Sequence, residues 1–173
     1  MDILAWLIGP LGAVQALNSV SIKQRPHPDG GLAAVDAPDV SLLQTVAHWQ
    51  GRQDLPVPAQ VSLSSVSRNG RGFCLDVVGS SGSLMLSSTN QKDYVHGFEL
   101  QHAPLGEPFR AVEPDADLAF PETWSDGRIA PVVRLLGWWA ESIRSGQPML
   151  PGLAEGVASR VACDQAQASF AHN

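Results

Sequence analysis

Two glycines, Gly79 and Gly82, enclose two serines in the stretch FCLDVVGSSGSLMLSS, residues 73–88. Closely spaced glycines can cradle a phosphate, and a serine between glycines can act as a nucleophile. A phosphate loop must lead from a strand into a helix, because the helix N-terminus supplies free N–H groups and the positive end of a dipole. Here alternating apolar residues precede and follow the turn, and the G-x-S-x-G pattern is not met. The stretch therefore predicts a structural hairpin.

The five histidines are scattered, with no H-E-x-x-H motif and no pair at helical spacing, so no metal site is predicted. His48 and His96 lie in segments that read as strands, where an imidazole either faces a substrate cleft or simply stands half-exposed. The acidic segment 113–126 fixes no two carboxyls together and predicts a solvated loop rather than an acid–base pair. The residues alone predict no catalytic or cofactor-binding set, and His48 and His96 are candidate substrate-binding residues.

The length and the net charge of the chain narrow the classes of protein to which it can belong. The chain has 173 residues and a formal net charge of -6. This length suits a single globular domain over 1–173 with a sizeable core. The Lys and Arg residues are scattered, which argues against a nucleic-acid partner because such binding needs clustered positive charge. Cys74 and Cys163 are too few for a disulfide framework, so we expect free thiols and a cytoplasmic location.

The apolar N-terminal run MDILAWLIGPLGAVQALNSV is a candidate signal peptide or membrane segment. A signal peptide begins with a positive region, whereas the second residue here is Asp2 and the first basic residue is Lys23. Gly9 and Pro10 interrupt the run, which leaves it too short to span a bilayer. We expect instead a short helix over 2–8 and no membrane association. A secreted or periplasmic protein is the alternative, and it requires the run to be a cleaved signal.

The apolar pattern predicts an α+β fold with an open, mainly antiparallel sheet of five or six strands and helices on one face. Asn69-Gly70 predicts a hairpin turn that leads into the strand at Phe73. Residues rich in Pro and Gly predict a loop over 25–31, and an irregular excursion is expected over 104–124. The expected strands are 13–23, 40–49, 57–64, the two arms of the 73–88 hairpin, and 94–102.

Two helices are expected in the C-terminal part of the chain. Apolar residues at helical spacing and the stop signal at Gly146 predict one helix over 129–145. Small residues along 151–169 predict a second helix that packs closely on the sheet. The predicted core consists of Val57, Val61, Leu63, Phe73, Leu75, Leu84, Ile129, Val133, Leu136, Val157 and Val161.

Four passages carry a family likeness: DILAWLIGPLGAVQA, FCLDVVGSSGSLMLSS, APVVRLLGWWAESIRSGQP and PGLAEGVASRVACDQAQAS. The second fits the phrase F-x-L-x-V-x-G-x-x-G-x-L-x-L. Together the passages span almost the whole chain. In this order they resemble the C-terminal domain of the glucose-fructose oxidoreductase, inositol dehydrogenase and related NAD(P)-dependent dehydrogenase family.

The resemblance implies a domain that supplies part of a substrate pocket and a subunit interface, with NAD or NADP as the cofactor of a complete family member. The family's glycine-rich Rossmann fingerprint and its Glu-Lys-Pro motif are missing from this sequence. Asp2 aligns with the last aspartate of the family's D-x-x-x-H-x-x-D junction motif, which makes it a third candidate substrate-binding residue. Without a glycine loop to hold the pyrophosphate, we expect a truncated or separately encoded second half that is inactive alone.

Two interpretations of the function stay open. One is the substrate-binding and association domain of an NAD(P)-dependent oxidoreductase acting on a sugar, inositol or similar polyol, with a separately encoded Rossmann domain as a possible partner. The other is a non-catalytic sugar-sensing or protein-binding regulatory module. Two helices cover only one face of a sheet, so the face with Gln60, Ser62 and Ser64 beside Leu42 and Val46 is expected to join copies of the chain into a homodimer or higher even oligomer, as the resemblance also implies.

Overall fold

The computed structural model describes residues 1–49 and 54–171, and the chain divides into two compact units. The first unit combines Met1–Arg68 with the segment that begins at Leu150, and the second is Asn69–Met149. Every described sheet is antiparallel and three α-helices accompany the sheets, so the predicted α+β class is confirmed. The prediction of a single domain over 1–173 stays a prediction.

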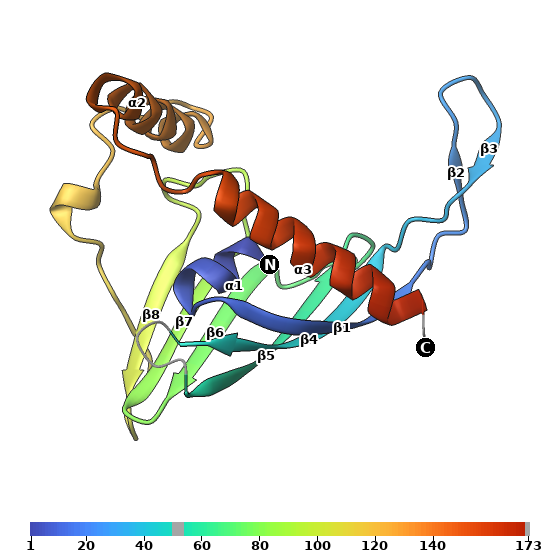
Figure 1. The fold of residues 1–173 in the computed structure, drawn as a ribbon, viewed down its shortest axis with the longest axis horizontal. Helices are drawn as coiled ribbons and strands as arrows, with labels where there is room; N and C mark the ends of the chain where they lie inside the picture. The colour runs from blue at the N-terminus through green and yellow to red at the C-terminus, as the bar shows by residue number, and fades with distance from the viewer. Residues whose placement is uncertain (50–53, 172–173) are drawn as a thin grey trace. The chain divides into compact units, whose positions relative to one another are not determined.

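The first unit is built on a three-stranded sheet. Its strands β1 (Leu11–Ser19), β4 (Val40–His48) and β5 (Pro56–Ser64) pair in the order β1-β4-β5. Helix α3 (Leu153–Ala171) packs on β1, and the short helix α1 (Asp2–Leu7) packs on α3 (Figure 1). The predicted N-terminal helix is therefore confirmed. The core between helix and sheet consists of Val14, Ala16, Leu43, Ala162 and Ala166.

A two-stranded hairpin projects from this unit between β1 and β4 (Figure 1). It consists of β2 (Gln24–Pro26) and β3 (Leu32–Ala34), so the loop predicted over 25–31 is the tip of a hairpin. The buried Asp39 fixes its base, because its carboxylate accepts hydrogen bonds from the backbone N–H groups of Ser21 (2.8 Å) and Ile22 (2.9 Å). The bond from Ser21 has the largest effect and that from Ile22 the next largest. Both lower the pKa of Asp39, so the carboxylate stays charged.

The second unit contains a four-stranded sheet in the order β6-β7-β8-β9. The strands are β6 (Phe73–Gly79), β7 (Gly82–Ser88), β8 (Glu99–Pro104) and β9 (Arg110–Ala111). Gly79 pairs with Gly82 across the turn, which confirms the hairpin predicted for 73–88.

A short 3-10 helix and one long α-helix complete this unit. They are η1 (Ala116–Leu118) and α2 (Ile129–Ser145). Helix α2 ends at Gly146 in the left-handed conformation (φ 68), as the sequence predicts. The Arg134 guanidinium of α2 donates to the carbonyl oxygens of Leu118 (3.0 Å) and Ala119 (2.7 Å) and lies over the ring of Phe120. These contacts tie α2 to the segment that follows η1.

The described strands form three hydrogen-bonded sheets rather than the single sheet of five or six strands that the sequence predicts. That prediction joined β5 to β6 through a tight turn at Asn69-Gly70. Asn69 does adopt the left-handed conformation (φ 55), but residues 65–72 all lie outside strands. Ser64 Oγ accepts hydrogen bonds from the N–H groups of Val66 (3.3 Å) and Ser67 (3.1 Å), and these bonds turn the chain directly after β5.

The predicted core was largely wrong. Helix α3 directs Ala162 and Ala166 toward β1, which leaves Val157 and Val161 exposed. The small alanines let the helix approach the strand closely. The apolar stripe of α2 is likewise exposed, and Ala130 is the residue of this helix that is buried. Exposed members of the predicted core are Leu63, Leu84, Ile129, Val133, Leu136, Val157 and Val161, and partly buried members are Val57, Val61, Phe73 and Leu75.

Candidate functional site

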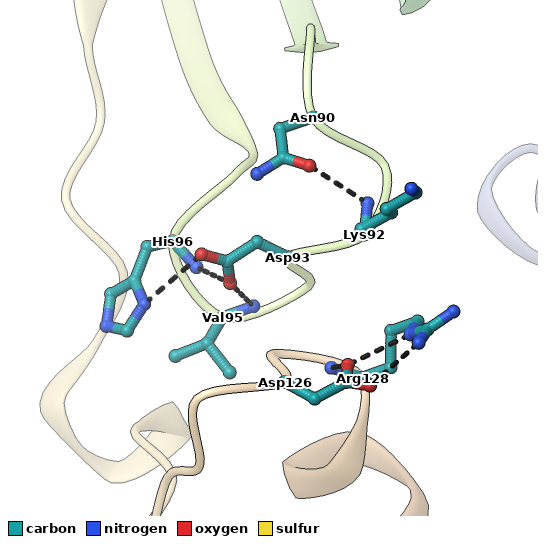
Figure 2. Close-up of polar contacts among 7 residues, drawn as sticks. All are labelled: Asn90, Lys92, Asp93, Val95, His96, Asp126 and Arg128. Carbon is teal, nitrogen blue, oxygen red and sulfur yellow. Dashed lines mark hydrogen bonds and ion pairs between the residues drawn. The ribbon is translucent and has the colours of Figure 1, made fainter.

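A group of polar contacts organises the loop between β7 and β8 (Figure 2). Asp93 is at its centre: Oδ1 accepts hydrogen bonds from the backbone N–H groups of Val95 (3.0 Å) and His96 (2.9 Å). Its other oxygen, Oδ2, lies 3.7 Å from Nδ1 of His96. The strand predicted over 94–102 begins only at Glu99, because the Asp93 carboxylate takes backbone donors that a strand ladder would use. His96 therefore lies in a turn.

The charge of Asp93 sets the chemistry of the neighbouring imidazole. The hydrogen bond from the N–H of His96, and then that from Val95, lowers the pKa of Asp93 below its ordinary value. The carboxylate is therefore ionised at neutral pH and can only accept hydrogen bonds. Its position beside Nδ1 favours a proton on that nitrogen of His96, which leaves Nε2 with its lone pair. The His96 side chain is 74% exposed, so Nε2 is open to a ligand.

Three glycines in and around this loop leave no room for a side chain. A Cβ added to Gly72 would collide with the Ser88 carbonyl oxygen, and one on Gly97 would collide with the carbonyl oxygens of Asn90 and Asp93. A Cβ on Gly127 would collide with the Asp93 carboxylate. Gly72 and Gly127 therefore approach the loop closely from outside it, and Gly97 lets the loop fold tightly on itself.

An ion pair lies beside the loop, immediately before α2 (Figure 2). Nε and Nη2 of Arg128 donate to the two oxygens of Asp126 at 2.9 and 2.7 Å, and the Arg128 backbone N–H donates to the same carboxylate at 3.0 Å. The side-chain bonds from Arg128, followed by its backbone bond, lower the pKa of Asp126 to about 2. The two charges are therefore paired with each other, and Arg128 is not a free cation. Gly127, which lies between them in the sequence, is next to the Asp93 carboxylate of the loop.

The other two predicted pocket residues belong to the first unit. Asp2 is the first residue of α1, and its Oδ1 accepts a hydrogen bond from Ser159 Oγ of α3 at 3.0 Å. His48 ends β4, and its backbone N–H donates to the Pro10 carbonyl oxygen at 2.9 Å. Its Nε2 lies 3.7 Å from the point where a Cβ on Gly12 would stand. Within the described ranges, no hydrogen bond or ion pair joins Asp2 to His48.

The sheet face opposite α3 carries a row of three glutamines. Gln15 of β1 pairs with Gln44 of β4, which pairs with Gln60 of β5, so the three side chains lie side by side on one face. They line an open depression of about 620 Å³. The next row on this face contains Leu17 and Leu42, which are 63% and 39% exposed. An open face that combines amides with apolar groups can bind a small polar molecule or another protein surface.

The sequence interpretation missed Asp93, Gln15 and Gln44. The spacing Asp-x-x-His at 93–96 is a signal for Asp93, because an Asp side chain commonly bonds the backbone two or three residues ahead. The glutamine row has a weaker signal. Gln15 and Gln44 lie between buried residues and Gln60 between half-buried ones, but only the strand register shows that the three are adjacent.

The described ranges give no sign of a metal site or a membrane span. They contain no group of three or more His, Cys, Asp or Glu side chains placed to hold a metal ion. No helix in the same ranges has the length and apolar character needed to cross a membrane. Cys74 and Cys163 are both free thiols.

Comparisons with known proteins relate the sequence to an oxidoreductase. No family model matches the chain. Its sequence is 40% identical over 166 residues to an uncharacterised oxidoreductase of Synechocystis sp., a match that covers 94% of this chain and 43% of the relative.

Two solved structures share the fold. Levoglucosan dehydrogenase, in complex with NADH and L-sorbose, matches with a TM-score of 0.64 and 17% identity over 95% of this chain and 47% of that one. An NAD-binding oxidoreductase from Klebsiella pneumoniae matches with a TM-score of 0.73 and 16% identity over 99% of this chain and 46% of that one. The chain therefore shares its fold with part of each of these two structures, and it spans less than half the length of each of the three proteins that it matches.

Proposed function

We propose that this chain is the substrate-binding and association domain of an NAD(P)-dependent oxidoreductase that acts on a sugar, an inositol or a similar polyol. The observation that carries the proposal is the 40% identity to an oxidoreductase along 94% of the chain. The fold shared with levoglucosan dehydrogenase, whose structure holds NADH and L-sorbose, supports a polyhydroxylated substrate. We assign the chain to the C-terminal part of such an enzyme on the four passages quoted above.

In this proposal the dinucleotide is held by a Rossmann domain and not by this chain. A pyrophosphate needs a glycine-rich turn that leads from a strand into a helix. The sequence contains no G-x-G-x-x-G, and the turn at Gly79 and Gly82 joins two strands. Hydride transfer therefore requires a partner domain for NAD or NADP, and we expect the chain to be inactive alone. The cytoplasm stays the predicted location.

The glutamine row is the proposed association surface. Gln15, Gln44 and Gln60 are exposed beside Leu17 and Leu42, so the face mixes hydrogen-bonding and apolar groups as protein interfaces do. A glutamine amide both donates and accepts, which suits a self-complementary contact across a two-fold axis. We propose a homodimer or higher even oligomer joined through this face.

Titration calorimetry and reconstitution test the proposal. We expect the chain to bind inositol or L-sorbose and to bind NADH weakly or not at all. Adding the part of the Synechocystis relative that this chain does not match should restore polyol-dependent reduction of NAD. Tight NADH binding by this chain alone would overturn the division of roles. Polyol binding without any restored activity would favour the sugar-sensing alternative.

A further inference from the structure

The β7–β8 loop contains a histidine whose orientation is fixed by its surroundings. Asp93 accepts two backbone hydrogen bonds, from Val95 and His96, while its second oxygen faces Nδ1 of His96 at 3.7 Å. Gly127 lies against the same carboxylate with no room for a Cβ. The carboxylate therefore has little freedom to turn away from the imidazole.

His27 offers a comparison within the same chain. It also has an aspartate nearby, with Asp29 Oδ2 at 3.5 Å from its Nδ1. Here, however, Nδ1 accepts a hydrogen bond from the Asp29 backbone N–H at 3.3 Å, so in the neutral ring the proton belongs on Nε2. The neighbouring Gly30 and Gly31 have open space where a Cβ would stand. The hairpin tip thus has the same residue types without the enclosing contacts and with the opposite tautomer.

We infer that Nε2 of His96 accepts a hydrogen bond from a hydroxyl group of the substrate, and that Asp93 is the residue that positions it. The chemical class of the ligand, an uncharged polyol, rests on the proposed function. The geometry agrees with that class, because a lone pair backed by a carboxylate attracts a hydroxyl donor and disfavours an anion. Asp93 acts through His96 and does not itself touch the ligand.

Long-range proton–nitrogen NMR spectra of the histidine rings test the positioning role without any ligand. Above neutral pH, His96 should carry its proton on Nδ1 and His27 on Nε2, with the signals assigned through His96→Gln and His27→Gln. In Asp93→Asn the side-chain oxygen can still accept the backbone bonds while its NH₂ group faces Nδ1 as a donor. We therefore expect the His96 proton to move to Nε2 in that variant. A wild-type His96 protonated on Nε2 would overturn the inference.

Binding of inositol and L-sorbose to the whole chain tests the contact role. His96→Ala should weaken binding by about tenfold, the loss typical of one hydrogen bond. His96→Gln, whose amide oxygen also accepts, should recover part of that loss, and His27→Ala should bind like the wild type. Because His96 is exposed, none of these changes removes core packing.

The outcomes separate this inference from the proposed function. Polyol binding that is equal in the wild type and His96→Ala would refute the role of His96 while leaving the substrate-binding domain in place. Absence of polyol binding in the wild type would refute the proposed substrate class, and the inference with it. Binding that falls equally in His96→Ala and His27→Ala would show a general effect of losing an imidazole and would also overturn the inference.

Discussion

Gly72 and Gly106 form a natural pair for measuring what close packing contributes around the β7–β8 loop. Both have φ 80, a conformation that costs an alanine about 1–2 kcal/mol. A Cβ on Gly72 would collide with the Ser88 carbonyl oxygen, whereas a Cβ on Gly106 would meet nothing within 4 Å. Forcing an atom into such a filled site costs about 1–3 kcal/mol more.

Gly72→Ala should therefore lower the free energy of unfolding by about 2–5 kcal/mol, and Gly106→Ala by only about 1–2 kcal/mol. Both glycines belong to the second unit, and the effect of alanine on the unfolded chain is common to both, so the difference isolates the collision. Urea unfolding followed by circular dichroism measures it. Equal losses in the two variants would refute the view that the loop is enclosed at close range.

Three further predictions concern other contacts. Ala162→Leu overfills the contact between α3 and β1, where Ala162 is only 4% exposed, and should cost about 1–3 kcal/mol in urea unfolding. The pKa of Asp126 is lowered from 3.8 to about 2, so its contact with Arg128 stabilises the fold at pH values above 3.8, and this stabilisation is lost as the pH falls toward 2. A carboxyl-carbon NMR titration of Asp126 with a midpoint at the ordinary pKa would contradict this. Leu42→Glu should dissociate the proposed oligomer in sedimentation experiments, while Val78→Glu, at a position 82% exposed on β6, should not.

Local signals in the sequence predicted much of the secondary structure. The period of two in residues 73–88 and the glycines at 79 and 82 predicted the β6–β7 hairpin, and Gly146 predicted the end of α2. These features depend on neighbours a few residues away, so a single sequence contains them in full. The exposure of Gln60 opposite the half-buried Val61 follows from the same alternation.

Long-range packing was harder to predict. The valines of α3 are larger and more apolar than its alanines, and hydrophobicity alone favoured Val157 and Val161 as core residues. The structure buries Ala162 and Ala166 instead, because close approach of a helix to β1 rewards small side chains. The single sheet was over-predicted for a related reason. A turn signal at Asn69-Gly70 indicates where the chain reverses but not whether the flanking strands pair.

The candidate site was also only partly predictable from the sequence. The sequence pattern predicts that His96 lies on a strand, yet the residue lies in a turn that the backbone hydrogen bonds to Asp93 create. The contact between Gly127 and Asp93 joins residues more than thirty positions apart, which no local pattern reveals. Asp2 and His48 stay predictions as substrate-binding residues, each with a described contact of its own.

The β2–β3 hairpin leaves the sheet at a base closed by Asp39, whose carbonyl oxygen also accepts the N–H of Ser65 at 2.9 Å. These hydrogen bonds hold the base of the hairpin in place next to the sheet. Residues can be added or lost at Gly30 and Gly31, where no neighbouring atoms lie within 4 Å of an added Cβ, without changing the register of β1 against β4. The tip is thus well suited to vary in length during evolution, and a peptide tag inserted there should disturb the rest of the unit little.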